Sequence, residues 1–166
     1  MRPSLYKQNT WTFRGQSLLE FSLLLPAFMF TIAGIFDLSR GVFYYNNLSE
    51  AARSAVRYAI VNGENSTSAA GPCPTESSCD CSDETAPNTG AIRSAAVTRT
   101  IAMDTSTSAL TVTCSWPDQN SAGTYLNSRG KRVSVTLSYV YQPILTSFIP
   151  GANITLQGGA TSYIQY

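Results

Sequence analysis

The stretch Gly15-Gln16-Ser17-Leu18-Leu19-Glu20-Phe21, together with the apolar run that follows it to Phe36, decides the fold of this chain. A basic, polar leader ends at Gly15, and Glu20 is the only charged side chain between that glycine and Phe36. Residues 18–36 are long enough to cross a hydrocarbon layer of roughly 30 Å as a helix. We therefore expect this segment to span a membrane.

The charges around the apolar run predict its orientation. Arg2, Lys7 and Arg14 precede it, and no acidic residue does. The positive-inside bias then keeps the N-terminus in the cytoplasm and places the bulk of the chain outside it. A cleaved secretory signal would end at a small-residue site, which the sequence after Phe36 lacks, so we expect the apolar segment to be retained as an anchor. Pro26 removes one backbone donor and should kink the helix locally.

The helix should continue beyond the membrane. Apolar positions recur at close to helical spacing as far as Val61, and Asn62-Gly63 is a natural stop. One helix from Gln16 to Val61 would be about 70 Å long, so half of it must project outward. The outer half has small side chains that allow close packing. The expected packing positions along the whole helix are Pro26, Gly34, Ala52, Ala55 and Ala59.

The rest of the chain predicts a small α+β domain. Residues 64–88 are rich in Ser, Thr, Pro and acidic residues and read as a loop, and a short helix is expected over 90–103. Alternating patterns then predict strands over 110–116 and 133–141, and a last strand over 154–166 that is bent at Gly158-Gly159. The expected architecture is α+β, one long N-terminal helix packed on three or four antiparallel strands. The predicted divisions are a leader over 1–15, a helix over 16–62 and an extracytoplasmic domain over 63–166.

The four cysteines fit an oxidising compartment. Cys79 and Cys81 are too close in sequence to pair easily, which leaves Cys73 with one of them and Cys114 with the other. Closing a loop of about 35 residues would contribute roughly 3 to 4 kcal/mol in the chain-entropy model. A four-cysteine zinc site is the rival interpretation, but the spacing lacks paired C-x-x-C motifs.

Composition argues against catalysis and against nucleic acid. The chain has no histidine, the commonest general base and metal ligand, and no phosphate loop or nucleophile motif is present. We expect no enzyme activity, no cofactor and no metal. Asp80, Asp83 and Glu84 could gather around calcium, but solvated loop charge explains them better. Three of the eleven basic residues lie in the leader, so eight oppose ten acidic residues in the remainder, and no basic surface for nucleic acid is expected.

The segment from Arg14 to Phe21 resembles the leader-peptidase site of type IV pilins. More narrowly, residues 15–59 resemble the TadE-like pseudopilins of tight-adherence (Flp) pilus systems. The residues that carry this resemblance are the Glu20-Phe21 pair, Leu25-Pro26, Gly34-Ile35-Phe36-Asp37, Arg40-Gly41, Ala51-Ala52-Arg53 and Arg57-Tyr58-Ala59.

This resemblance implies a mechanism of assembly. A prepilin peptidase would cut between Gly15 and Gln16, and Glu20, at mature position five, would pair with the new amine of an adjacent subunit. Many type IV pilins begin with phenylalanine, whereas this chain would begin with Gln16. The implied partners are other pilin and pseudopilin subunits, the prepilin peptidase, the inner-membrane assembly platform and, before assembly, membrane lipid. The implied location is the inner membrane and then the pilus. The alternative is a bitopic membrane-anchored sensor or adhesin domain without leader processing.

Overall fold

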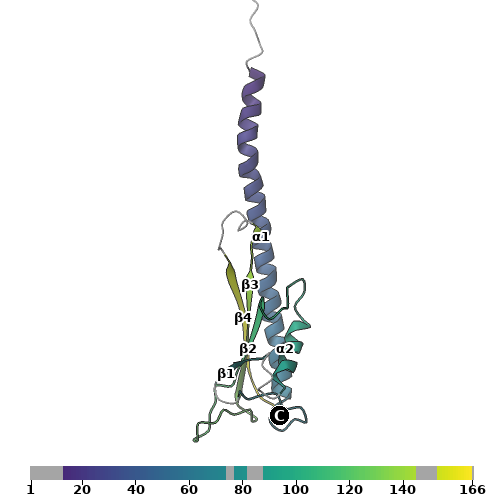
Figure 1. The fold of residues 1–166 in the computed structure, drawn as a ribbon, viewed down its shortest axis with the longest axis vertical. Helices are drawn as coiled ribbons and strands as arrows, with labels where there is room; N and C mark the ends of the chain where they lie inside the picture. Colours follow the sequence, from purple (N-terminus) through teal and green to yellow (C-terminus); the bar gives the residue numbers. More distant parts are fainter. Residues whose placement is uncertain (1–12, 74–76, 82–87, 145–152, 166) are drawn as a thin grey trace, which may run out of the picture.

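The fold is one long N-terminal helix against a four-stranded antiparallel sheet (Figure 1). This computed structural model describes residues 13–73, 77–81, 88–144 and 153–165, with side chains from Gly15 onward. The α+β architecture predicted from the sequence is confirmed. The elements in chain order are α1 (Phe13–Val61), β1 (Ser78–Asp80), α2 (Thr89–Val97), β2 (Leu110–Ser115), β3 (Arg132–Tyr141) and β4 (Ile154–Tyr163).

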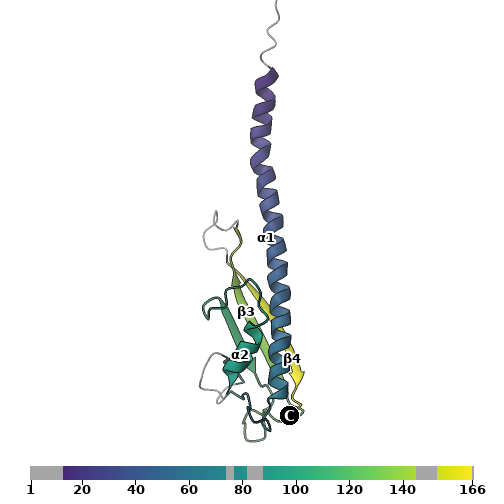
Figure 2. The same cartoon turned by 90° about the vertical axis from the view of Figure 1, so that its right-hand side faces the viewer.

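Helix α1 has two halves with different surroundings. In both views its first half projects beyond the rest of the protein, while its second half lies along the sheet (Figures 1 and 2). Within the described residues it is the one helix long and apolar enough to cross a membrane, and none of its most apolar 18-residue window is buried. The helix continues through Pro26. Its end is held by the backbone N–H of Gln165, which donates to the carbonyl of Ile60 at 3.0 Å.

The sheet is a meander in which each strand pairs with the next in sequence, in the order β1-β2-β3-β4. The longest ladder, β3 with β4, runs one to one from Arg132 opposite Tyr163 to Tyr141 opposite Ile154. Pairing is therefore continuous across Gly158 and Gly159. A methyl group at Gly158 would lie 2.7 Å from the backbone carbonyl carbon of Leu48, so this glycine permits close approach of α1 to β4.

The core lies between α1 and one face of the sheet. Alternate residues of β2 and β3 point into it, as the period-2 pattern predicts. The small side chains of α1 let the helix backbone approach that face closely. The buried residues of these three elements include Leu48, Ala51, Ala52, Ala55, Val56, Ala59, Leu110, Val112, Cys114, Val133, Val135, Leu137, Tyr139 and Tyr141.

Three of the sequence predictions need correction. The short helix expected over 90–103 ends at Val97, because the next turn tightens into i to i+3 hydrogen bonds and Ala102 has a left-handed φ of 58°. The segment 64–88, read as a loop, contains strand β1, which pairs with β2 through Cys79 opposite Cys114. The last strand ends at Tyr163 rather than continuing to Tyr166, which lies outside the described residues.

The disulfides are Cys73–Cys79 and Cys81–Cys114. This is one of the two pairings that the sequence left open. The second bridge joins the turn after β1 to β2 across 33 positions of chain. All four thiols are used, so a four-cysteine zinc site is not formed.

Candidate functional site

The expected cleavage site lies at the start of α1. Gly15 and Gln16 belong to the first turn, where backbone N–H groups have no intrahelical acceptor and helices fray. A side chain at Gly15 would meet nothing within 4 Å. Packing among the described residues therefore gives no reason for glycine at this position.

Glu20 and Phe21 both lie exposed on the projecting half of α1. The side-chain amide of Gln16 donates to Glu20 Oε1 at 3.4 Å, one helical turn away. No basic side chain among the described residues lies within ion-pair distance of Glu20. The carboxylate is thus displayed on the helix surface beside the position that the proposed cleavage would turn into a new amine.

The side chains around Glu20 form an uncovered apolar surface. Leu18 and Leu23 are 70% and 78% exposed, values that suit lipid or another helix rather than water. The other large apolar side chains exposed along residues 15–36 are Leu19, Phe21, Leu24, Leu25, Phe28, Met29, Phe30, Ile35 and Phe36.

The expected packing positions fall into two groups. Ala52, Ala55 and Ala59 are buried against the sheet and so act within the subunit. Pro26 is exposed on the projecting half, and Gly34 is half-buried near the junction with the sheet.

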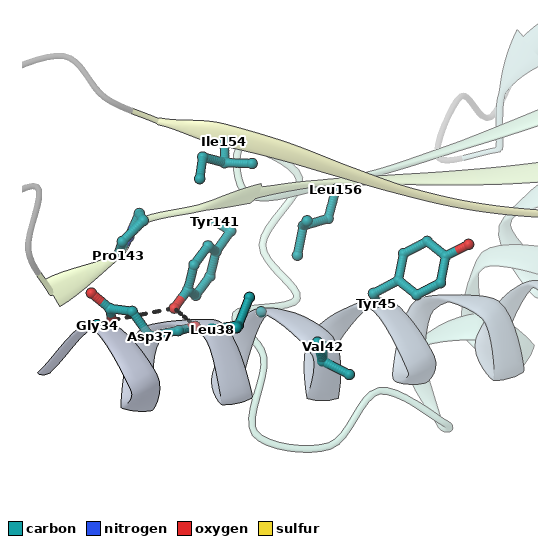
Figure 3. A pocket seen from close by; sticks show the side chains of 10 residues that line it. Gly34, Asp37, Leu38, Val42, Tyr45, Tyr141, Pro143, Ile154 and Leu156 are labelled. Atoms are coloured by element: carbon teal, nitrogen blue, oxygen red, sulfur yellow. Dashed lines mark hydrogen bonds between the residues drawn. The ribbon is translucent and has the colours of Figure 1, made fainter. Parts of the chain in front are cut away.

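The two halves of α1 meet at a polar junction centred on Asp37. The Tyr141 hydroxyl donates to the Asp37 carbonyl at 3.0 Å and lies 3.4 Å from its carboxylate (Figure 3). The backbone N–H of Ile144 donates to Asp37 Oδ1 at 2.9 Å. Asp37 is 7% exposed. The end of β3 is thereby tied to the first residue after the apolar run.

Arg40 and a group of tyrosines complete the junction. The Arg40 guanidinium lies 4.0 Å from Asp37 Oδ1 and 5.8 Å from the ring centres of both Tyr44 and Tyr141. Burial, followed by the nearby Asp37 carboxylate, raises the pKa of Tyr141, so its hydroxyl stays protonated and available as a donor. The Tyr44 hydrogen bond raises the pKa of Arg40, which keeps its charge.

Sequence reasoning missed the role of this junction. Asp37 and Arg40 are among the residues that carry the family resemblance, but nothing local in the sequence connects them with Tyr141, which lies 104 positions after Asp37. The available signal was the position of Asp37, an acid directly after a membrane-length apolar run, because a carboxylate there needs a partner.

The described part of the chain was expected to offer no cluster of metal-ligating side chains. No three His, Cys, Asp or Glu side chains gather there as ligands. Asp80 is exposed on β1, and the other two residues considered for calcium, Asp83 and Glu84, lie outside the described ranges.

Comparison with known proteins finds a family match for the N-terminal part of the chain. The model of a family described as TadE-like protein matches residues 15–57. This segment is most of α1, from the expected cleavage glycine, through Glu20 and Asp37, to the buried Ala52 and Ala55. No curated protein and no solved structure matches the chain. The resemblance found in the sequence is confirmed for this segment, and residues 15–57 are similar to the TadE-like family.

Proposed function

We propose that this chain is a minor pilin or pseudopilin of a tight-adherence type IV pilus system. The observation that carries the proposal is the division of α1, one continuous helix whose membrane-length first half is uncovered while its second half is packed on the sheet. Such a helix fits a single-pass membrane anchor, and it also offers a ready surface for packing against the helices of other subunits. The TadE-like match over this helix suggests the pilus system.

The proposed sequence of events begins in the inner membrane, with the N-terminus in the cytoplasm. A prepilin peptidase removes residues 1–15, and the fraying first turn of α1 gives it access to the bond between Gly15 and Gln16. The absence of any packing reason for Gly15 supports recognition by an outside partner. The assembly platform then moves the subunit from lipid into a filament, where the apolar surface of α1 packs against neighbouring helices.

In the proposal, Glu20 pairs adjacent subunits during this assembly. A carboxylate within an apolar surface is costly unless a cation meets it, and the ammonium group of Gln16 on an adjacent subunit supplies one. Its exposure and the lack of a basic partner among the described residues support this role. The domain over 63–166 would then face outward and contact other subunits or a surface.

Intact-mass measurement of the subunit extracted from its native membranes tests the processing step. The wild-type chain is expected to begin at Gln16, while Gly15→Val keeps its leader. Gly90→Val is the matched control, because a side chain at this helical glycine also meets nothing within 4 Å. This control should be processed normally. A wild-type chain that retains Met1 would contradict the proposal and favour an anchored sensor or adhesin domain.

A further inference from the structure

The junction at Asp37 fixes how deep one end of the sheet lies relative to the anchor. Asp37 follows Phe36 directly, and the backbone N–H of Ile144 donates to its carboxylate at 2.9 Å. Ile154 starts β4 directly opposite Tyr141, whose hydroxyl donates to the Asp37 carbonyl. Wherever the membrane ends along α1, this end of the sheet is held at the level of the residue that follows the apolar run.

This level corresponds to the lipid interface. If residues 18–36 fill the hydrocarbon layer, the headgroup region adds about 5 to 7 Å on each side. At a rise of about 1.5 Å per residue, the turn from Asp37 to Gly41 lies within that region. The start of β4 and the end of β3 therefore lie at headgroup depth as well.

The side chains at this end of the sheet are apolar and uncovered. Ile144 and Ile154 are each 50% exposed, and on the adjoining turns of α1 Leu38 is 71% and Val42 is 53% exposed. Three of them, Leu38, Val42 and Ile154, border a groove between helix and sheet with a volume of about 490 Å³ (Figure 3). The groove is continuous with the apolar surface of the anchor, since Gly34, Leu38 and Val42 of α1 line it together with Ile154 and Leu156.

The polar groups at the same level suit a phospholipid interface. The Asp37 carboxylate is turned inward onto Ile144 and Tyr141 and is shielded from the surface. Arg40 remains partly exposed beside Tyr44 and Tyr141. Arginine and tyrosine, each with an apolar body and a polar tip, are the residue types that anchor proteins among headgroups.

We propose that this end of the domain is a second membrane contact, in which Ile144, Ile154 and Leu38 enter the interface of the extracytoplasmic leaflet beside the anchor. The occupant of the groove is phospholipid, with Arg40 at phosphate level. The contact holds the domain in a fixed orientation on the membrane before assembly. It rests on the membrane anchoring in the proposed function, because α1 sets the depth of the sheet.

Quenching of tryptophan fluorescence by brominated phospholipid tests this contact, using the full chain in nanodiscs that hold one copy each. Ile154→Trp is expected to lose emission to an extent comparable with Phe36→Trp, a boundary position on the anchor. Tyr163→Trp is the matched control on the same strand, about 30 Å further from the membrane, and should not be quenched. The emission of the parent chain, which contains Trp11 and Trp116, is recorded separately and subtracted.

The possible results distinguish a failure of the proposed second contact from a failure of the proposed membrane anchor. Quenching of Ile154→Trp and Phe36→Trp but not of Tyr163→Trp supports the second contact. Quenching of Phe36→Trp alone overturns the contact and leaves the anchor standing. If neither Ile154→Trp nor Phe36→Trp is quenched, both the anchor and the contact are contradicted. A blue-shifted but unquenched Ile154→Trp would assign the groove to protein rather than lipid and would also overturn the contact.

Discussion

At the scale of single residues, Glu20 is displayed on the exposed first turns of α1, where a charge-neutral isostere can replace it without disturbing any packing. Glu20→Gln should leave membrane insertion unchanged but remove the proposed partner of the Gln16 amine. Stranding one member of a buried ion pair costs roughly 3 to 5 kcal/mol, so incorporation into filaments should drop by about 100-fold or more. The measurement is the amount of subunit in sheared filaments relative to membranes.

Glu50→Gln is the matched control for this prediction. Glu50 is an exposed glutamate on the same helix, within the domain half, and lies 3.7 Å from Arg53. Its replacement should leave incorporation near the wild-type level. Equal incorporation of Glu20→Gln and Glu50→Gln would contradict the proposed pairing of Glu20 with the Gln16 amine.

Asp118 should make the folding stability of the domain depend slightly on pH. Its carboxylate accepts hydrogen bonds from the Arg132 guanidinium and backbone N–H, each at 2.7 Å, and these bonds lower the pKa of Asp118. A lowered folded-state pKa contributes stability above the ordinary aspartate pKa, and this is lost as the pH falls through the folded value. The pair is partly exposed, so the effect is modest.

The measurement compares thermal unfolding of the wild type and Asp118→Asn in detergent micelles. The variant should unfold a few degrees lower at pH 7, and the gap should close at strongly acidic pH, where Asp118 is protonated. A gap of the same size at both pH values would show that the charge of Asp118 does not contribute.

At the scale of elements, the contact of α1 with β4 depends on one of two adjacent glycines. A methyl group at Gly158 would lie 2.7 Å from the Leu48 carbonyl carbon, whereas at Gly159 the nearest atom is Thr136 Oγ1 at an ordinary 3.5 Å. Gly158→Ala should force the helix away from the sheet and destabilise the fold by about 1 to 3 kcal/mol. Gly159→Ala should be nearly neutral. Thermal unfolding in micelles followed by Trp116 fluorescence measures both, and equal midpoints would contradict the close approach.

Elements with long periodic patterns were the ones that the sequence predicted well. Helix α1 and strands β2 and β3 carry their pattern over many residues, and their buried faces agree with it. Strand β1 has three residues, too few for any period, and exists because β2 pairs with it. After α2 the chain tightens into i to i+3 hydrogen bonds and then takes a left-handed backbone at Ala102, which alanine adopts rarely and which the sequence did not indicate.

The candidate site also contains residues that local sequence suggested and residues that it did not. Gly15, Gln16 and Glu20 stay predictions, and they could be proposed from the sequence because the pattern of a charge in an apolar run is local. The Asp37 junction depends on a strand end more than a hundred positions away, and such a pairing leaves no local pattern. The role of Asn127 could not be predicted for the same reason. Its buried side chain accepts a hydrogen bond from Trp116 Nε1 at 3.0 Å and donates one to the Ala70 carbonyl at 2.9 Å.

At the scale of the whole molecule, the elongated shape separates two kinds of surface (Figures 1 and 2). The projecting half of α1 offers an apolar surface for lipid or helices, and the sheet with its disulfides forms a compact head. In the proposed function the first surface serves anchoring and then filament packing, while the head faces outward. Both uses depend on the same helix, and the proposed filament packing requires that it be processed.

Mass spectrometry of purified, sheared filaments tests this account most directly. The account predicts that this subunit is present in the filaments as a chain whose first residue is Gln16. Filaments that lack the subunit, with the chain found only in membranes and still carrying Met1, would contradict it.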